Sequence, residues 1–434
     1  MKLVIVGTGY VGLVSGLCFA EFGFQTTCVD RNTSRIDSLK KGKCPFYEPG
    51  LTDLLKKHLK ETKLLSLCTS LSEAMVGADI VFITVGTPTK RLENEADLSA
   101  VYKVADDIAH NINKYCLVVT KSTVPVGTTK EINEIIKKKV NTEKFNVVSN
   151  PEFLREGSAI NDFMRPDRVV IGCDSVKAEN IMCELYRPLF LLETPIVSTT
   201  IESAEIIKYA SNSFLATKIA FINQVADLCE IVGGNVQDVA KAMGLDKRIG
   251  SKFLHAGPGF GGSCFPKDVK AFISTAKKFD VDLSIVDSVN HSNLKRPKQI
   301  ISKIRKKFNN NLVDKTFSIL GLSFKPNTDD VRDSTSIMIA ESLHREGAII
   351  KAYDPKAMEN AKEVLPNIHY SNSINESCIG VDAIIIATEW NEFRALNFKL
   401  LKEQMKDYII FDLRNIYNED EITNLGFTYY GIGK

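Results

Sequence analysis

The sequence predicts an α/β protein with two doubly wound, parallel-sheet domains that are separated by a helical region. In the first half, apolar runs of strand length alternate with amphipathic segments of helix length, a pattern typical of a parallel sheet covered by helices on both faces. This alternation stops near Thr199 and resumes at Thr316, and the residues between are helical in character. At 434 residues the chain is long for one hydrophobic core, so two or three domains are expected.

The expected strands are short and apolar. In the first half they cover residues 2–7, 26–30, 79–85, 116–122, 145–150 and 168–172, and in the second half 316–324, 348–354, 383–390 and 408–415. Residues 201–232 contain neither Gly nor Pro and predict one long helix, of a kind that often joins domains or forms a subunit interface. We therefore divide the chain into an N-terminal α/β domain (1–198), a central helical region (199–298) and a smaller C-terminal α/β domain (299–434).

A glycine-rich turn follows the first expected strand. Gly7, Gly9 and Gly12 form G-x-G-x-x-G between that strand and a helix, so that the turn is tight and the backbone can approach a pyrophosphate at the helix N-terminus. Asp30 ends the next strand, at the spacing expected of a carboxylate that binds ribose hydroxyls. The combination predicts a Rossmann-like dinucleotide site, whereas the glycines alone would also suit a turn that binds nothing.

The same carboxylate bears on the choice of cofactor. Asp30 would accept hydrogen bonds from ribose hydroxyls and repel a 2′-phosphate, which favours NAD over NADP. Arg31 and Arg35 lie close by in the sequence and weaken this preference, because an arginine can hold a 2′-phosphate.

Composition and charge exclude several classes of partner. Lys and Arg (55) nearly balance Asp and Glu (53), which gives no reason to expect nucleic acid or an anionic membrane as a partner. Ten scattered cysteines show no C-x-x-C pair and no Cys/His metal spacing, so we expect no metal and a reducing, cytoplasmic location. The apolar run after Lys2 is similar to a signal peptide, but glycines 7, 9, 12 and 16 interrupt it and fit the nucleotide turn better.

The segment 257–268, GPGFGGSCFPKD, is the strongest local candidate for a catalytic site. Its glycines let the backbone wrap closely around a ligand, and Cys264 lies beside Lys267 and Asp268. A thiol near a cation gains nucleophilicity. A single cysteine is more often inert packing, but the surrounding glycines and charges favour a nucleophile here.

Polar residues outside this loop complete the candidate site. Lys208 and Asn212 are four residues apart on the long helix, so both leave the same face and could donate hydrogen bonds to an oxyanion; a solvated helix face is the alternative. Thr123 and the pair Glu152 and Glu156 follow strand ends, where open α/β sheets bind ligands. The carboxylates could act as bases or hold sugar hydroxyls, although paired Glu residues on a surface helix are also common.

Seven motifs occur in one order across nearly the whole chain and together resemble the UDP-glucose/GDP-mannose dehydrogenase family. They are GTGYVGL, VGTPTK, KSTVPVGTT, SNPEFLREG, the Lys208–Asn212 pair, GPGFGGSCFPKD and GLSFKPNTDDVRDS. The resemblance implies an N-terminal NAD domain, a central dimerisation region, a C-terminal UDP-binding domain and a homodimer or higher oligomer. It also implies a four-electron oxidation of UDP-glucose to UDP-glucuronate with two NAD⁺ and water, through a thiohemiacetal and a thioester on Cys264.

The resemblance also implies a role for each matched residue. Asp268 would help to activate water, Lys208 and Asn212 would stabilise oxyanions, Glu152 would act as acid and base, and Thr123 would position a water. The residues expected to bind the cofactor are Gly7, Gly9, Tyr10, Val11, Gly12, Asp30, Arg35, Thr87, Thr123, Glu156, Lys267 and Arg332. Those expected to bind the substrate are Glu152, Phe153, Leu154, Arg155, Glu156, Lys208, Asn212, Arg248 (across a dimer), Phe253, Leu254, His255, Ala256, Gly257, Gly261 and Lys325.

Two departures from the family pattern and three alternatives stay open. Gly86 stands where many relatives carry Asn, and His255 occupies a variable position, so the fine substrate contacts are not fixed. The substrate could be GDP-mannose or another sugar nucleotide. A two-electron hydroxyacid dehydrogenase similar to 6-phosphogluconate dehydrogenase would need no nucleophilic Cys264 and would leave the last domain without a task. A non-catalytic NAD sensor would lack the set of Cys, Lys, Asn and Asp that is present here.

Overall fold

The computed structural model describes residues 1–90 and 95–434, which form two compact units. The first unit contains residues 1–211 and 274–281, and the second contains residues 212–273 and 282–434. Helix α9 (Ile201–Val232), at the bounds predicted from the sequence, and helix α11 (Phe265–Lys278) each contribute to both units. The three-region division of the chain stays a prediction, because the units share the central helices between them.

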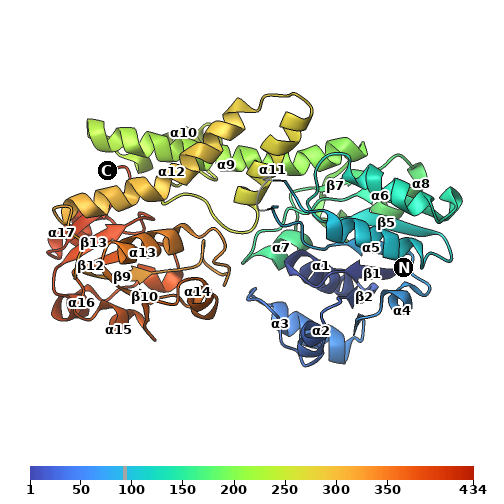
Figure 1. Ribbon diagram of the computed structural model, residues 1–434, viewed down its shortest axis with the longest axis horizontal. Coiled ribbons are helices and arrows are strands. Elements are labelled where there is room, and N and C mark those ends of the chain that lie inside the picture. Colours follow the sequence, from blue (N-terminus) through green and yellow to red (C-terminus); the bar gives the residue numbers. More distant parts are fainter. Residues whose placement is uncertain (91–94) are drawn as a thin grey trace. The chain divides into compact units, whose positions relative to one another are not determined.

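The first unit is built on an eight-stranded sheet in the order β3-β2-β1-β4-β5-β6-β7-β8 (Figure 1). The strands are β1 (Lys2–Val6), β2 (Gln25–Val29), β3 (Leu65–Cys68), β4 (Ile80–Ile83), β5 (Cys116–Thr120), β6 (Phe145–Ser149), β7 (Val169–Gly172) and β8 (Ile196–Thr199). All neighbours are parallel except β6 and β7, which pair antiparallel through Ser149 and Gly172. The expected parallel sheet is therefore confirmed apart from this one reversal.

Helices cover both faces of this sheet. They are α1 (Tyr10–Glu21), α2 (Thr33–Lys40), α3 (Leu51–Lys56), α4 (Leu71–Met75), α5 (Ser99–Ala109), α6 (Thr128–Lys137), α7 (Ala159–Met164) and α8 (Val176–Leu185), with short helices η1 (Lys57–Glu61), η2 (Thr142–Lys144) and η3 (Arg187–Leu192). Alternate residues of β1 face opposite cores: Leu3 and Ile5 pack with α1, α3 and α7, whereas Val4 and Val6 pack with α4, α5 and α6. Strands buried on both faces explain the continuous apolar runs in the sequence.

The second unit contains a six-stranded, wholly parallel sheet in the order β11-β10-β9-β12-β13-β14. Its strands are β9 (Thr316–Leu320), β10 (Ile349–Tyr353), β11 (His369–Tyr370), β12 (Ala383–Ile386), β13 (Ile409–Asp412) and β14 (Thr428–Gly431). Its other elements are α10 (Val236–Leu245), α12 (Ser284–Lys307), α13 (Thr335–Arg345), α14 (Met358–Val364), α15 (Ile374–Cys378), α16 (Phe398–Gln404), α17 (Glu419–Asn424) and the short η4 (Asn391–Arg394).

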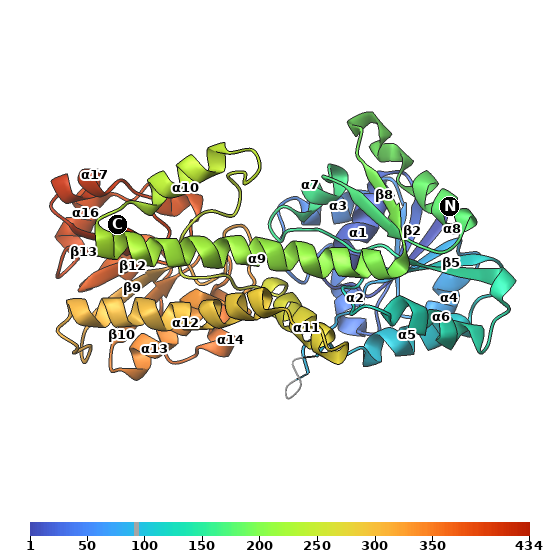
Figure 2. The same ribbon diagram turned by 90° about the horizontal axis from the view of Figure 1, so that it is seen from above.

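Within the second unit, α9 and α12 run side by side over one face of the sheet (Figure 2). Ile222 and Ala226 of α9 and Ile300 and Ile304 of α12 belong to the same buried cluster as the strand residues of that face. The opposite face of the sheet packs against α15, α16 and α17. Among the residues that the structure describes, no helix combines the length and apolar character needed to cross a bilayer.

The sheet of the first unit positions the candidate site. The four neighbouring strands β1, β4, β5 and β6 end at Val6, Ile83, Thr120 and Ser149, and the segment that follows each of them carries predicted site residues. Because parallel strands end at the same edge of a sheet, these segments gather at its carboxyl edge. The order of strands reverses between β1 and β4, which is where open α/β sheets bind nucleotides.

Candidate active site

The glycine-rich turn between β1 and α1 has the close packing that its sequence predicts. Gly7 has φ +105°, and a Cβ atom there would lie 2.9 Å from the carbonyl oxygen of Thr84. A Cβ atom on Gly12 would lie 1.9 Å from the carbonyl oxygen of Gly7, so neither position accepts a side chain. A Cβ atom on Gly9 would meet nothing within 4 Å. The turn is therefore packed tightly on its inner side and leaves room at Gly9 for a ligand to approach the backbone.

Asp30 lies at the end of β2 and borders a cavity of about 660 Å³. Its carboxylate accepts hydrogen bonds from the amide and hydroxyl of Thr8 (2.9 and 2.7 Å) and from the amide of Asn32 (3.0 Å). Burial alone would raise the pKa of Asp30, but these hydrogen bonds and Arg35 lower it overall, so the group is ionised at neutral pH. Arg35 pairs with Asp30 at 3.3 Å.

These residues fit a dinucleotide. Gly7, Gly9, Asp30 and Arg35 line the cavity of about 660 Å³, together with residues that follow β4. A tight glycine turn at a helix N-terminus suits a pyrophosphate, and an ionised carboxylate at the end of the second strand suits ribose hydroxyls. Arg35 could have favoured a 2′-phosphate, but here its guanidinium group pairs with the Asp30 carboxylate.

A buried ion pair occupies the carboxyl edge of the first unit. Lys208 of α9 and Glu152, which follows β6, approach to 3.0 Å, and each side chain is only 4% exposed. The Lys208 ammonium also lies 5.3 Å from the centre of the Phe153 ring. Lys208 is therefore not on a solvated helix face, and the structure brings together two residues predicted separately from the sequence. Residues 150–155 form a loop, so Glu152 and Glu156 do not share a surface helix.

Thr123 lies in a loop that is fixed to α9. The buried carboxylate of Glu205, one helical turn before Lys208, accepts hydrogen bonds from the amides of Gly127 (2.7 Å) and Thr129 (2.8 Å) at the start of α6. The hydroxyl of Thr87 donates to the carbonyl oxygen of Thr123 at 2.9 Å. The segments after β4 and β5 and the first turns of α9 are thus connected by hydrogen bonds within the first unit.

The loop that carries Glu152 and Glu156 is also hydrogen-bonded to the glycine-rich turn between β1 and α1. Glu48 is buried, and its carboxylate accepts hydrogen bonds from the amides of Gly157 (2.6 Å) and Ala159 (2.8 Å) and from the Tyr10 hydroxyl. Tyr10 belongs to the glycine-rich turn, and its hydroxyl contacts this loop, including the Gly157 amide at 3.1 Å. Arg155, by contrast, is an exposed side chain that pairs with Asp162.

In the second unit, Asp268 is the centre of a polar cluster. It is 1% exposed; its carboxylate accepts a hydrogen bond from the Asn212 amide at 2.7 Å and pairs with the Lys267 ammonium at 2.7 Å. Cys264 immediately precedes α11, and its carbonyl oxygen accepts the Asp268 amide at 2.8 Å, so the cysteine and this cluster are one helical turn apart. That backbone hydrogen bond belongs to the first turn of α11, whose N-terminal N–H groups favour a negative charge on a neighbouring thiol.

Four of the other cysteines are poorer candidates for a nucleophile than Cys264. All ten cysteines are reduced, with no disulfide between them. Burial raises the pKa of Cys28 and Cys116 to about 12. It also raises the pKa of Cys18 and of Cys378. These four thiols are protonated at neutral pH and enclosed in hydrophobic cores, whereas Cys264 is half-buried.

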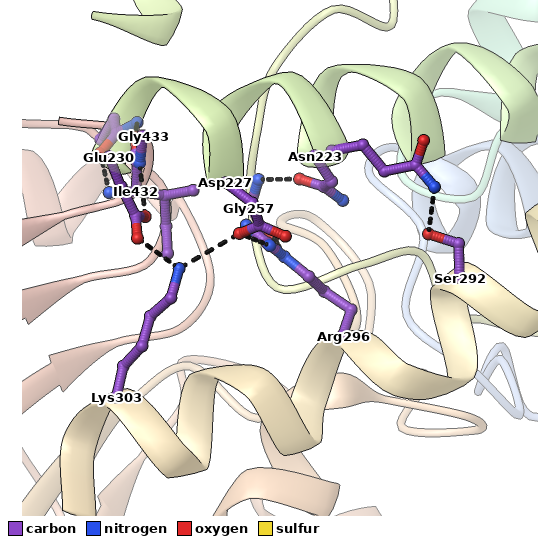
Figure 3. A network of polar contacts seen from close by, with 11 residues as sticks. Asn223, Asp227, Glu230, Gly257, Ser292, Arg296, Lys303, Ile432 and Gly433 are labelled. Atoms are coloured by element: carbon purple, nitrogen blue, oxygen red, sulfur yellow. Dashed lines mark hydrogen bonds and ion pairs between the residues drawn. The ribbon is translucent and has the colours of Figure 1, made fainter. Parts of the chain in front are cut away.

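A network of polar side chains, in which Asn223 and Arg296 are buried, holds the glycine-rich loop that leads to Cys264 (Figure 3). The Gly257 amide donates to Asn223 of α9 at 2.8 Å, and its carbonyl oxygen accepts from Arg296 of α12 at 3.0 Å. Arg296 in turn pairs with Asp227 at 2.5 Å, and Lys303 pairs with the same carboxylate at 3.2 Å. The two helices therefore hold Gly257 through both its amide and its carbonyl group.

The predicted substrate loop also borders a cavity of about 410 Å³ in the second unit. Leu254, His255 and Ala256 line it, as do the cationic side chains of Lys241, Lys252 and Arg414 from α10, the loop and the end of β13. Three cations around one cavity suit an anionic ligand. The residue just before this stretch, Phe253, has φ +65°.

Other predicted residues have local partners. Arg248 pairs with Asp246 and its side chain is 90% exposed, and Arg332 pairs with Asp330 at 2.8 Å. The Lys325 ammonium lies 5.3 Å from the Phe324 ring, and a Cβ atom on Gly261 would lie 2.2 Å from the carbonyl oxygen of Asp333. Val11 and Gly12 lie in the first turn of α1. The binding roles that the family resemblance implies for these residues stay predictions.

Several buried polar residues around the site were missed in the sequence. Glu48, Glu205, Asn223 and Arg296 act through hydrogen bonds to backbone groups that are remote in sequence, so no local spacing marks them. Lys121 could have been noticed, because a lysine directly after an apolar strand is unusual for a core position.

Comparison with known proteins identifies the family of the chain. Three models of the UDP-glucose/GDP-mannose dehydrogenase family match the chain: the NAD binding domain at residues 1–190, the central domain at 202–295 and the UDP binding domain at 318–419. The UDP-glucose 6-dehydrogenase of Rhizobium meliloti (strain 1021) is 49% identical over 436 residues, which cover 100% of both chains.

Two solved structures are also similar. A UDP-glucose dehydrogenase from Pyrobaculum islandicum has a TM-score of 0.90 and 37% identity, and the match covers 97% of this chain and 95% of that one. A UDP-D-ManNAc dehydrogenase from Pyrococcus horikoshii has a TM-score of 0.87 and 27% identity, with 100% and 99% covered.

The fold and the dinucleotide site define an NAD-dependent dehydrogenase with two Rossmann-like sheets. The chain belongs to the UDP-glucose/GDP-mannose dehydrogenase family.

Proposed function

We propose that this protein oxidises UDP-glucose to UDP-glucuronate with two NAD⁺ and water, through covalent intermediates on Cys264. The observation that carries the proposal is the polar cluster of Asp268, Asn212 and Lys267 one helical turn from Cys264. The relatives named as UDP-glucose dehydrogenases support the choice of substrate. A two-electron dehydrogenase would have no use for a thiol placed in this way.

The cofactor would be held by the turn at Gly7, Gly9 and Gly12 and by the carboxylate of Asp30. When bound, NAD⁺ accepts one hydride from the reacting carbon at each of the two oxidations. Because Asp30 is ionised, it would repel the 2′-phosphate of NADP.

The chain's own residues would handle the carbon atom between and after the oxidations. Once the alcohol is oxidised to an aldehyde, the Cys264 thiolate attacks the aldehyde carbon, a C–S bond forms, and the oxyanion takes up a proton to give a thiohemiacetal. Loss of a second hydride and of that hydroxyl proton leaves a thioester. Covalent capture keeps the aldehyde from leaving before the second oxidation.

Hydrolysis then releases the product. Water adds to the thioester carbon and loses a proton to a base, the C–S bond breaks, and the thiolate of Cys264 is restored as the carboxylate leaves. We assign the acid and base role to Glu152, oxyanion stabilisation to Lys208 and Asn212, and support of the water to Asp268 and Thr123. Lys208 and Asn212 are one turn apart on α9, so a single helix carries both proposed oxyanion donors.

The substrate's anionic part would bind in the second unit. The cavity beside residues 254–256 is lined by Lys241, Lys252 and Arg414, whose charges suit a diphosphate. We further assign the remaining substrate contacts to the residues expected from the family resemblance, with the exposed Arg248 able to reach a neighbouring subunit.

We also propose that the protein forms a homodimer through α9 and α12. Phe221 of α9 and Ile285 of α12 are 48% and 72% exposed and border a groove of about 330 Å³. Exposed apolar side chains on adjacent helices are unfavourable in water and would be covered by a second copy. The reduced cysteines suit a cytoplasmic location.

The stoichiometry of the reaction tests the proposed function. The purified protein should form two NADH for each UDP-glucuronate, and UDP-glucose should be used in preference to GDP-mannose, UDP-N-acetylglucosamine and free glucose. One NADH per sugar with an aldehyde product would favour the two-electron alternative. A preference for GDP-mannose would keep the mechanism and change the substrate.

A further inference from the structure

Glu48 is a buried carboxylate to which the proposed reaction gives no role. It lies in the segment between α2 and α3 and is 5% exposed. Its carboxylate accepts hydrogen bonds from the Gly157 amide (2.6 Å), from the Ala159 amide (2.8 Å) and from the Tyr10 hydroxyl. A buried charge is costly unless hydrogen bonds compensate the lost hydration. The three donors that do so belong to two segments to which the proposed function gives different ligands.

Tyr10 connects Glu48 to the dinucleotide turn. It is the first residue of α1 and directly follows Gly9, where a ligand can approach the backbone. Its hydroxyl contacts Glu48 and also accepts a hydrogen bond from the Gly157 amide at 3.1 Å. Its ring centre lies 4.9 Å from that of Phe46, which belongs to the same segment as Glu48. The backbone of Tyr10 thus belongs to the turn that suits a pyrophosphate, while its side chain is held by the segment that carries Glu48.

Gly157 and Ala159 connect Glu48 to the loop after β6. Residues 150–155 form a loop, so their order depends on how its two ends are held. One end continues from β6, and the other reaches α7 through Gly157, whose φ is +80°, and Ala159 at the start of that helix. Glu48 binds the amides of this second end, directly after the predicted substrate residues 152–156.

These contacts form one continuous chain of hydrogen bonds inside the first unit, from Tyr10 through Glu48 to Gly157. A pyrophosphate bound at the turn would restrain the backbone of Tyr10 and, through its hydroxyl, the loop end that Glu48 holds. A second ligand that binds a loop already restrained loses less conformational entropy, which gives positive coupling between two sites without a change of structure. Such coupling is reciprocal, so each ligand strengthens the binding of the other by the same factor.

We propose that Glu48 is a positioning residue that couples occupancy of the dinucleotide turn to the order of residues 152–156, so that cofactor and substrate strengthen each other's binding. Glu48 acts through Tyr10 and Gly157 and needs no contact with either ligand. The proposal rests on the binding roles given above to the glycine-rich turn and to residues 152–156.

Hydrogen exchange with and without NADH tests the coupling in the absence of substrate. In the wild type, saturating NADH should slow amide exchange in peptides that cover residues 150–160 by about 5-fold or more, the lower end of the coupling usual between two sites. Tyr10→Phe removes only the hydroxyl, and Glu48→Gln removes the charge that accepts the three hydrogen bonds. Both variants keep the glycine turn and Asp30 and should still bind NADH, but NADH should no longer slow exchange in these peptides.

Tyr429→Phe is the matched control, because the buried Tyr429 donates a hydrogen bond to another buried carboxylate, Asp412 in the second unit, at 2.9 Å. It should keep the response of the wild type. Tyr10→Phe is the milder of the two variants and decides the test if Glu48→Gln does not fold. Exchange that NADH does not slow in the wild type, or slows equally in the wild type and Tyr10→Phe, would overturn the proposal.

Calorimetry measures the same coupling through the substrate. NADH already carries the hydride and cannot oxidise UDP-glucose, so the Kd of UDP-glucose can be measured with and without saturating NADH. NADH should lower this Kd by about 5-fold or more in the wild type and in Tyr429→Phe, and by about 2-fold or less in Tyr10→Phe. A purely structural role of the hydroxyl would lower stability and leave this factor unchanged, and an equal factor in Tyr10→Phe and the wild type would therefore contradict the role of Glu48. If UDP-glucose does not bind while NADH slows exchange as described, the coupling stands and the proposed substrate is wrong.

Discussion

The buried pair of Glu152 and Lys208 gives a prediction that separates stability from chemistry. Glu152→Gln keeps the size of the side chain and removes its charge. The Lys208 ammonium then loses a charged partner at 3.0 Å in a place where both side chains are only 4% exposed. Lys121 remains nearby as a second buried cation. The variant therefore leaves two positive charges without the Glu152 carboxylate that compensates them.

The size of the effect follows from this burial. Removing one partner of a buried ion pair costs about 3–5 kcal/mol, because the remaining charge stays desolvated. Glu346→Gln serves as a matched control: its pair with Arg305 at 2.5 Å is 30–40% exposed, and such pairs contribute about 0–1 kcal/mol. Replacing both members in Glu152→Leu/Lys208→Met should recover much of the stability lost in Glu152→Gln, since an apolar pair needs no compensation.

Urea unfolding followed by circular dichroism measures the stabilities, and NADH formation measures the activities. Turnover should be lost in Glu152→Gln and remain lost in the double variant whose stability recovers. The reasoning would be refuted if Glu152→Gln were as stable as the Glu346→Gln control. Recovery of turnover together with stability in the double variant would show that the pair has only a structural role.

Three further predictions concern the cofactor and the subunit interface. Asp30→Asn should raise the KM for NAD⁺ by about 10-fold or more, because a hydrogen bond to a charged group contributes roughly 1.5–3 kcal/mol. It should also narrow the preference for NAD⁺ over NADP⁺. Equal kcat/KM for both cofactors in the wild type would contradict the role of Asp30. Gly12→Ala should abolish NAD⁺ binding in calorimetry or prevent folding, since its Cβ would lie 1.9 Å from the Gly7 carbonyl oxygen, and unchanged affinity would show that the turn is not rigid. Phe221→Glu/Ile285→Glu should sediment as a monomer at concentrations where the wild type is a dimer, and a wild type that is a fully active monomer would refute the interface.

The fold was largely predictable, and the strands that were missed share a physical cause. All ten expected strands exist, whereas β3, β8, β11 and β14 were not predicted. These four are the edge strands of the two sheets. An edge strand has a neighbour on one side only and is less enclosed, so its sequence carries a weaker apolar signal; the residues of β8, for example, are mostly exposed. The reversed direction of β7 was also missed, because strand direction is not encoded in local periodicity.

The site was predictable where its residues are close in sequence. The glycine turn with Asp30 and the loop around Cys264 have fixed spacings that reflect local backbone geometry. Contacts between distant segments could not be predicted, such as the approach of Lys208 to Glu152 or the support of Gly257 by Asn223 and Arg296. These depend on which strands and helices become neighbours, and only the folded chain settles that.

The central claim, covalent catalysis at Cys264, is tested most directly by Cys264→Ser. Serine is a much poorer nucleophile at neutral pH, and an oxygen ester would hydrolyse more slowly than a thioester. The variant should therefore still bind NAD⁺ and UDP-glucose, while steady-state formation of UDP-glucuronate collapses. Intact mass spectrometry should detect either a slowly hydrolysing ester of the sugar nucleotide on the protein or no adduct at all. Near-normal turnover in Cys264→Ser would contradict covalent catalysis at this residue.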